Sequence, residues 1–282
     1  MKKYIPISVL LLGACSGGEA PVVEGTVIGQ TSVDIDTRVE TTHAGEAAIG
    51  NYIADVLGSD FAAHGHPVDV SLVNAGAIRG GPVDETTFTF LTPGAARGQV
   101  YPAGDLTDID VAGWLPFSND QVVMQIDGVV LLEVLERSAS ALPADLANLG
   151  GGWLLHPSAG LHYEIDCAGQ RQVINATGDA IETPGTRIRR IELHGEVIFD
   201  RENDIDLLAD VSIAVGLNSF LADGRDGFLA LGEVTDRYFI GHAEMDWVAS
   251  IRADIEANSP ITPASEGRIV VHGSCNEPLS LP

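Results

Sequence analysis

Three junctions rich in polar residues, two of them with glycine and two with phenylalanine, stand where a strand is expected to end or a helix to begin. They are residues 74–79 (NAGAIR), 116–119 (PFSN) and 218–228 (NSFLADGRDGF). Loops that follow strands often carry ligand contacts. Taken one at a time, the two phenylalanines fit a core, and the asparagines and the aspartate fit turns. A binding site is therefore indicated by the three junctions together and not by any one residue.

Helices and strands are interleaved along the chain and must position these junctions. Apolar residues at helical spacing predict a helix over residues 45–63, and an apolar strand over 68–73 follows it. Thr107 and Asp110 form a capping-box pattern that opens a short helix ending before Pro116. The remaining elements are expected as strand 121–127, helix 128–142, strands 153–156, 161–166, 187–194 and 211–217, helix 243–258 and strand 268–272.

This order of elements predicts an α+β fold, in which a single domain has mixed β-sheets with flanking helices. The 282 residues, 45% of them hydrophobic, are enough to bury a core. Residues 81–104 lack periodicity and are expected to form an irregular surface excursion.

The charge balance excludes one class of partner. The chain has 40 acidic and 15 basic residues, which gives a net charge of −25. Such a surface repels phosphate polyanions and anionic lipid surfaces, so nucleic acid is not expected as a partner. A single anionic ligand can still be held by one or two arginines.

The N-terminus has the features of an export signal. Lys2 and Lys3 precede an apolar stretch over residues 4–12, which is too short to span a bilayer. Residues 12–15 (LGAC) resemble the bacterial lipobox, so residues 1–14 are expected to be a signal peptide and Cys15 an acylated anchor. The alternative is a conventional signal peptide cleaved nearby, with Cys15 incidental. We expect an extracytoplasmic bacterial lipoprotein, periplasmic or on the cell surface, that contacts the membrane only through its anchor, with residues 15–25 as a tether.

Export also bears on the other two cysteines. Thiols outside the cytoplasm tend to be oxidised, and Cys167 and Cys275 remain as an even pair. We expect a disulfide between them, and the alternative is two free buried thiols.

The three junctions, taken in order, resemble motifs of the C-terminal, nucleoside-recognising domain of the 5′-nucleotidase family. Residues 46–55 (EAAIGNYIAD) are similar to that family's E-x-x-L-G-N helix start, and residues 258–261 (NSPI) and 267–269 (GRI) match its end. The resemblance covers residues 26–272, and we take residues 26–282 as one domain of this type.

The resemblance implies a purine-binding side of the site. Phe117 and Phe220 would stack on the two faces of a purine, and Asn119 would hydrogen-bond the base edge. Gly160 would let the backbone approach the base.

The resemblance also implies a ribose and phosphate side. Asp226 would accept hydrogen bonds from the ribose hydroxyls, and Arg79, with Asn74 beside it, would reach the phosphate or ribose. Family members usually carry a phosphate-binding arginine just before the E-x-x-L-G-N helix, but residues 41–46 (TTHAGE) have none. Arg225, which replaces a family glycine, is a candidate substitute. Selectivity is therefore expected to move toward the nucleoside.

The catalytic half of two-domain nucleotidases has no counterpart in this sequence. Its D-x-H, G-N-H-[ED] and G-H-x-H motifs do not occur, and the histidine-containing segments 64–66 and 242–246 have ordinary turn and helix-start explanations. No catalytic residue, metal ligand or cofactor is therefore expected in this chain, and the two divalent metals would belong to a separate metallophosphatase domain.

These observations leave three hypotheses for function. The chain is a lipid-anchored domain that binds nucleosides or nucleotides, with purines favoured, and is inactive in isolation. Alternatively, it is the substrate-binding half of a split 5′-nucleotidase whose metallophosphatase is a separate subunit. The third hypothesis is a degenerate scaffold that binds nothing.

Overall fold

The computed structural model describes residues 25–81, 83–84, 89–90, 95–148 and 150–275. The expected signal peptide, Cys15 and nearly all of the tether lie outside the described residues. No helix within the described ranges is long and apolar enough to cross a membrane.

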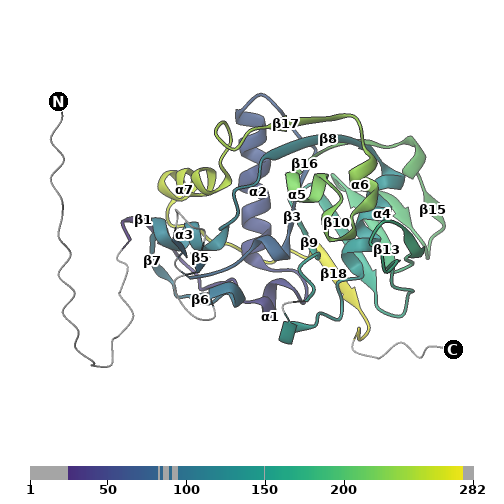
Figure 1. Cartoon of the computed structure of the whole chain (residues 1–282), viewed down its shortest axis with the longest axis horizontal. Coiled ribbons are helices and arrows are strands. Elements are labelled where there is room, and N and C mark those ends of the chain that lie inside the picture. Colours follow the sequence, from purple (N-terminus) through teal and green to yellow (C-terminus); the bar gives the residue numbers. More distant parts are fainter. Residues whose placement is uncertain (1–24, 82, 85–88, 91–94, 149, 276–282) are drawn as a thin grey trace, which may run out of the picture.

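Two five-stranded sheets form the framework of the described part of the chain (Figure 1). Sheet 1 has the order β17 (Arg237–Ile240), β8 (Gln121–Asp127), β16 (Ser212–Asn218), β3 (Val70–Asn74) and β9 (Leu155–Pro157). Sheet 2 has the order β15 (Ile205–Asp206), β14 (Glu196–Asp200), β13 (Ile188–Leu193), β10 (Leu161–Asp166) and β18 (Ile269–His272). Smaller pairs are β1 (Val27–Thr31) with β7 (Gly104–Thr107), β2 (Ile35–Asp36) with β6 (Val100–Tyr101), β4 (Val83–Asp84) with β5 (Thr89–Phe90), and β11 (Val173–Ile174) with β12 (Ile181–Thr183).

The strand directions in sheet 1 bring four loops to one edge. Strands β3 and β16 are parallel neighbours, and they end at Asn74 and Asn218. Strands β8 and β9 are antiparallel to them, and each begins opposite one of these ends, because Gln121 pairs with Asn218 and Leu155 with Asn74. The chain leaving β3 and β16 and the chain entering β8 and β9 therefore meet at the same edge.

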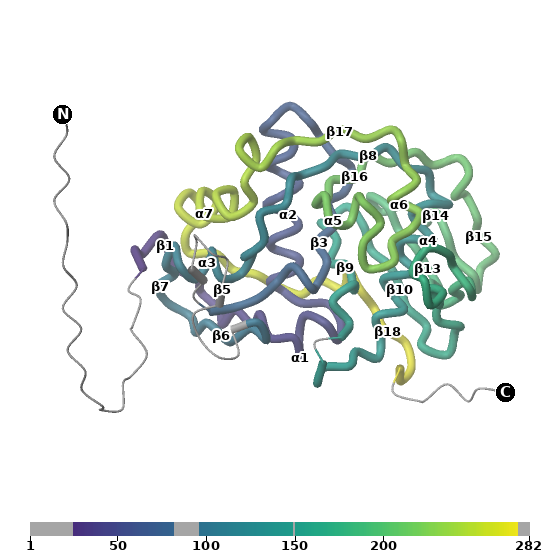
Figure 2. Tube along the Cα trace, viewed as in Figure 1, coloured from purple at the N-terminus to yellow at the C-terminus, as the bar shows by residue number. Residues whose placement is uncertain are grey.

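Helices surround the two sheets. They are α1 (Val39–Thr42), α2 (Ala48–Ala63), α3 (Asp108–Trp114), α4 (Gly128–Ala139), α5 (Ser219–Ala222), α6 (Leu229–Glu233) and α7 (Trp247–Asn258). Figure 1 shows α2 through the centre, with α3 and α7 on one side and α4 on the other. In Figure 2 the yellow segment that leads from α7 to β18 crosses the molecule beside α2.

The core has two parts. One hydrophobic cluster joins the two sheets to α4 and includes Met124, Leu135, Tyr163 and Phe228. The other packs α2, α3 and α7 together around residues such as Trp114. The predicted α+β fold with mixed sheets is confirmed.

Several predicted elements agree closely with the structure. The capping box at Thr107 is present, since its side chain accepts from the Asp110 backbone amide and the Asp110 carboxylate accepts from the Thr107 amide. Strands β8 and β10 have the predicted bounds. The last helix begins at Trp247, four residues later than predicted, because the Asp246 carboxylate caps it by accepting from the Val248 amide at 2.9 Å.

The prediction that residues 81–104 form an irregular excursion was wrong for the part that the structure describes. Strands β4, β5 and β6 and the first residue of β7 lie there. Each of these three strands has only two residues, which is too short for an alternating pattern to show in the sequence. The short edge strands β15 and β17, of two and four residues, were also missed.

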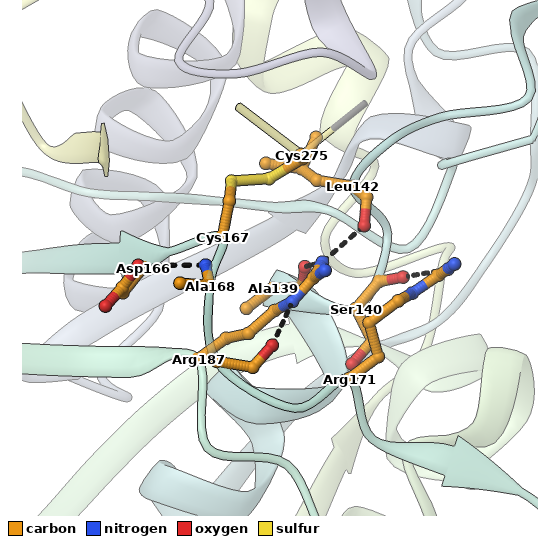
Figure 3. Close-up of a disulfide and its surroundings, with 10 residues drawn as sticks. Ala139, Ser140, Leu142, Asp166, Cys167, Ala168, Arg171, Arg187 and Cys275 are labelled. Atoms are coloured by element: carbon orange, nitrogen blue, oxygen red, sulfur yellow. Dashed lines mark hydrogen bonds between the residues drawn. A yellow bond between two sulfur atoms is a disulfide. The ribbon is translucent and has the colours of Figure 1, made fainter. Parts of the chain in front are cut away.

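Cys167 and Cys275 form a disulfide with a Cα–Cα distance of 4.8 Å. It joins the residue after β10 to the segment beyond the parallel strand β18. Figure 3 shows the buried Arg187 beside it, whose guanidinium donates to the carbonyls of Ala139 and Leu142. The bridge therefore lies beside a buried arginine whose guanidinium is hydrogen-bonded to backbone carbonyls.

Candidate functional site

A cavity of about 320 Å³ lies at the edge of sheet 1 where the four loops meet. Six of the predicted site residues line it, and they come from all three junctions: Asn74, Arg79, Phe117, Asn119, Phe220 and Asp226. Gly76, Ala77 and Asn218 of these junctions also line it, together with Gly152 and Trp153, which the sequence did not predict. We call this space the cavity.

The two predicted stacking residues have exposed rings. Phe117 and Phe220 are 40% and 39% exposed, although both belong to a residue type that is usually buried. Phe117 is held in a turn in which the Asn119 amide donates to its carbonyl at 3.0 Å. The side-chain amide of Asn119 makes no hydrogen bond to any described residue. Apolar rings and an amide are therefore available to a planar ligand with a polar edge.

Two buried asparagines form the floor at the ends of the parallel strands. Asn218 donates from Nδ2 to Asn74 Oδ1 at 3.2 Å, and its Oδ1 accepts from the Leu221 amide at 3.0 Å, which caps α5. These bonds fix which way the Asn74 amide points. Its NH₂ group is left without a hydrogen-bond partner among the described residues.

Arg79 and Asp226 are the charged residues of the cavity lining. The Arg79 guanidinium lies 5.7 Å from the centroid of the Phe117 ring and donates to the Ile78 carbonyl. Burial lowers the pKa of Arg79, an effect that Asp226 opposes. Burial raises the pKa of the Asp226 carboxyl, and Arg137 and Arg79 oppose that shift. The cavity thus places a half-buried cation and a half-buried carboxylate beside aromatic rings.

Glycines are needed where two of the loops touch. The Gly76 amide donates to the Gly152 carbonyl at 2.6 Å. A Cβ added at Gly76 would lie 3.0 Å from that oxygen, and one added at Gly152 would lie 3.1 Å from the Gly76 Cα. This close approach brings Trp153 to the cavity.

Comparison with known proteins agrees with this geometry. The family model for the 5′-nucleotidase C-terminal domain matches residues 27–233. The chain belongs to this family. The 5′-nucleotidase precursor from Thermus thermophilus has a similar structure, with a TM-score of 0.64 and 25% identity over 89% of this chain and 40% of that chain. NAD nucleotidase from Haemophilus influenzae shares the fold, with a TM-score of 0.58 and 17% identity over 89% of this chain and 38% of that one.

Two curated relatives are similar over most of this chain. They are a trifunctional nucleotide phosphoesterase from Bacillus subtilis, 23% identical over 88% of this chain and 14% of its own length, and an apyrase from Tabanus yao, 25% identical over 82% and 35%. The 5′-nucleotidase C-terminal domain described here therefore spans about a third of the apyrase and a smaller share of the phosphoesterase.

Gly160 does not line the cavity. It borders a separate hollow with Ser158 and Asp55. A Cβ at this position would lie 2.7 Å from His194 Cε1 and 2.8 Å from the Asp69 carbonyl oxygen, so close packing accounts for the glycine. The role of approaching the base, which the resemblance suggested for Gly160, does not fit this position.

Gly152 and Trp153 are the neighbours of the cavity that sequence reasoning missed. Three glycines at residues 150–152 stand between the predicted helix 128–142 and the predicted strand 153–156. The antiparallel pairing of β9 with β3 turns this run toward the cavity. The run of three glycines before an aromatic residue was the available signal.

Residues 41–46, where the resemblance led us to look for a phosphate-binding arginine, include the buried Thr42 and His43. His43 is fully buried and its Nδ1 lies 2.8 Å from the Gly150 carbonyl. Because a carbonyl only accepts, Nδ1 carries the proton. Burial lowers the pKa of His43, so the imidazole is neutral and supports the glycine run instead of offering a cation. Arg225 is exposed and is not part of the cavity lining.

Four residues of the other family motifs form a separate polar network together with Glu266, which we call the Glu46–Arg268 cluster: Glu46, Asn51, Asp55, Glu266 and Arg268. Glu46 accepts from Asn51 Nδ2 at 2.6 Å and from the backbone amides of residues 266–268 at 2.8 to 3.1 Å. Burial alone would raise the pKa of Glu46, but these hydrogen bonds outweigh it and lower the pKa. The cluster ties the start of α2 to the segment that enters β18.

The histidines and carboxylates do not form an obvious metal site in the described ranges. No group of three or more His, Cys, Asp or Glu side chains there is arranged to hold a metal ion.

Proposed function

We propose that the cavity binds a purine nucleoside or a nucleoside monophosphate. The observation that carries this proposal is the convergence of two half-exposed phenylalanines, a free amide, a carboxylate and an arginine on one space of about 320 Å³. Aromatic stacking is worth ~1 to 3 kcal/mol per base and is compatible with any base. The Asn119 amide, which can donate and accept, supplies contacts to a base edge.

The sugar is assigned to the charged end of the cavity. An ionised carboxylate only accepts hydrogen bonds, which makes Asp226 a partner for a ribose diol. Arg79 and the free Asn74 NH₂ group supply donors for the ribose or for a phosphate. A charge-assisted hydrogen bond contributes ~1.5 to 3 kcal/mol, so the neutral His43 in place of an arginine costs a phosphate ligand roughly 10- to 150-fold in affinity. We therefore propose that adenosine binds about as well as AMP.

We further propose that the domain works outside the cytoplasm as a lipid-anchored protein. The lipobox-like residues 12–15 and the apolar segment before them support this location. The Cys167–Cys275 disulfide is also consistent with it, because disulfides persist in oxidising compartments.

A second candidate function is the substrate-binding half of a split nucleotidase. It is favoured by the coverage of the relatives, since this chain spans only 14% and 35% of two proteins whose names denote hydrolases. In this case a separate metallophosphatase subunit would hold the two metals and carry out hydrolysis.

Calorimetric titration of the purified chain with adenosine, AMP and a sugar nucleotide tests the binding proposal. We expect adenosine and AMP to bind with affinities within a few-fold of each other. AMP binding a hundredfold more tightly would contradict the assignment of the phosphate side, and binding of none of the three would favour the degenerate scaffold.

Phosphate release from AMP in the presence of Mn²⁺ tests whether this chain hydrolyses a nucleotide alone or only together with a metallophosphatase subunit. We expect none from the chain alone under either function. Release that appears only after a metallophosphatase subunit is added would support the split enzyme. Chelator-sensitive release by the repurified chain alone would contradict both.

A further inference from the structure

Arg137 of α4 lies behind two walls of the cavity without lining it. Its Nε donates to the backbone carbonyl of Asp226 at 2.6 Å. Its guanidinium also lies 4.7 Å from the centroid of the Trp153 ring. One side chain thus joins the loop that enters β9 to the turn that follows α5, and both of these segments line the cavity.

The turn that carries Asp226 needs such support. Asp226 has a φ of +56°, in the left-handed region that side chains other than glycine rarely adopt. It is flanked by Gly224 and Gly227, which also have positive φ. A Cβ added at Gly227 would lie 2.9 Å from Arg137 Nε, so the turn and the guanidinium are packed against each other. The position of the Asp226 carboxylate is therefore coupled to that of Arg137.

Arg137 also contributes charge. Two guanidinium groups face the Asp226 carboxyl from separate elements, Arg137 from α4 and Arg79 from the segment after β3, and Arg137 has the larger effect. Arg171 faces Arg137 from the loop after β10 and, together with burial, lowers the pKa of Arg137. Without Arg137, a half-buried Asp226 would keep only Arg79 to offset the cost of burying its charge.

We propose that Arg137 is a positioning residue of the cavity, whose charge and planar head group hold the Asp226 carboxylate in place for the hydroxyl groups of a bound ribose. This inference rests on the proposed nucleoside-binding function. It adds a residue that does not contact the ligand but sets the preference for ribose over sugars that lack the 2′ and 3′ hydroxyl groups.

The role has two parts that two substitutions separate. Arg137→Gln removes the positive charge and most of the planar guanidinium group. Arg137→Lys keeps the charge but cannot both donate from the Nε position and stack its head group on Trp153 in the same way. We expect the positive charge of Arg137 to favour the ionised form of the Asp226 carboxyl, and its planar guanidinium group to fix the position of that carboxyl.

The test measures the affinities of adenosine and 2′,3′-dideoxyadenosine from pH 4.5 to pH 8 for the wild type and both variants. In the wild type we expect adenosine to bind roughly 10-fold or more tightly at pH 8, a preference that decreases as pH falls and Asp226 becomes protonated. In Arg137→Gln the midpoint of this decrease should move to higher pH. In Arg137→Lys the midpoint should stay near that of the wild type while adenosine binds more weakly at every pH.

A second readout does not depend on ligand. The ¹³C chemical shift of the Asp226 carboxyl group, followed against pH in the ligand-free protein, should titrate at higher pH in Arg137→Gln than in the wild type. This separates the inference from the proposed function. Wild-type protein that binds no nucleoside would refute the proposed function and the ribose preference, while the carboxyl titration would still decide whether Arg137 holds Asp226 ionised.

Arg201 offers a matched control. Its Nε donates to the Ile188 carbonyl at 2.6 Å and its guanidinium lies 5.0 Å from the Phe199 ring centroid, so it makes the same two kinds of contact away from the cavity. Unlike Arg137, it also donates from Nη2 to the buried Glu136 at 3.0 Å. Arg201→Gln should leave both the ribose preference and its pH midpoint unchanged. The inference is overturned if Arg137→Gln weakens both ligands equally with an unshifted midpoint, or if its Asp226 carboxyl titrates as in the wild type.

Discussion

The cavity and the Glu46–Arg268 cluster are both built from motif residues of one family, but their polar groups are satisfied in opposite ways. In the cluster, the buried Arg268 donates to Asp55, to Glu266 and to the Pro157 carbonyl. At the cavity, Arg79 donates to a single backbone carbonyl, and the Asn119 amide has no partner among the described residues.

The two arginines also differ in their protonation behaviour. Burial alone would lower the pKa of Arg268, but its carboxylate partners outweigh burial and raise it. The pKa of Arg79 is lowered by burial, with only Asp226 opposing. A motif residue whose partners all lie within the protein maintains the fold, and one left with unused donors is available to a ligand.

The largest effect that would test this contrast is on stability. Arg268→Ala should lower the free energy of unfolding by about 3 kcal/mol, because it leaves Asp55, Glu266 and a buried carbonyl without their partner. The melting temperature should fall by roughly 6 to 12 °C in a chain of this size. Thermal unfolding followed by circular dichroism measures this, with Arg79→Ala as the control that should change stability much less. Equal losses in the two variants would remove the distinction.

Acid should also destabilise the part of the fold that carries the cluster. His156 of β9 is fully buried, and burial lowers its pKa to about 4. The unfolded chain, with a histidine pKa near 6.5, therefore binds a proton that the folded chain rejects, and stability falls as pH drops from 6.5 toward 4. Each pH unit inside this window is worth ~1.4 kcal/mol, so we expect a loss of roughly 2 to 3 kcal/mol between pH 6.5 and 4.5.

Denaturant unfolding at several pH values measures this loss. His156→Gln keeps a donor for the Thr42 carbonyl but does not titrate, so its stability should depend less on pH in this window. A variant with the full wild-type pH dependence would show that other groups are responsible.

On the cavity side, the largest effect should be on affinity. Phe220→Ala should weaken the binding of adenosine and of AMP by similar factors, equivalent to ~1 to 3 kcal/mol. The factors are similar because the ring stacks on the base, which the two ligands share. Stability should change little, since the ring is already 39% exposed. Phe239 is a matched control, with 44% exposure and a position on edge strand β17, and Phe239→Ala should leave both affinities unchanged. Unchanged affinity in Phe220→Ala would refute the assignment of the cavity.

The smallest effect should be a difference between two ligands. Arg79→Ala should weaken the binding of AMP roughly 10-fold more than the binding of adenosine, because a guanidinium stabilises a phosphate more than a hydroxyl. Parallel calorimetric titrations of the variant and the wild type measure this difference. Equal losses for both ligands would place Arg79 at the ribose and not at the phosphate.

Local signals in the sequence were sufficient for some elements and for most of the site. The capping box at Thr107 and the alternating pattern of β8 depend on neighbours within a few residues, so they could be read directly. Six cavity residues came from the family motifs. Trp153 was missed because its position depends on the pairing of β9 with a strand 80 residues earlier, which no local pattern encodes.

The same limit explains one misjudged position, Gly160, and one supporting contact, that of His43, which the sequence did not indicate. Gly160 was given a ligand role because a motif context suggested one, whereas its packing against His194 involves a distant segment. The supporting role of His43 for residues 150–152 depends on a contact across more than 100 residues. Side chains that act through such contacts, Arg137 among them, become visible only in three dimensions.

The Cys167–Cys275 disulfide closes a covalent ring that contains only some of the residues that line the cavity. Asn218, Phe220 and Asp226 lie within the ring that the disulfide closes, whereas the other lining residues lie outside it. A protease that cuts the chain once between residues 167 and 275 therefore produces no separate fragment while the bridge is intact. The nicked protein would keep both parts of the cavity in one molecule, and on a denaturing gel the cut would appear only after reduction.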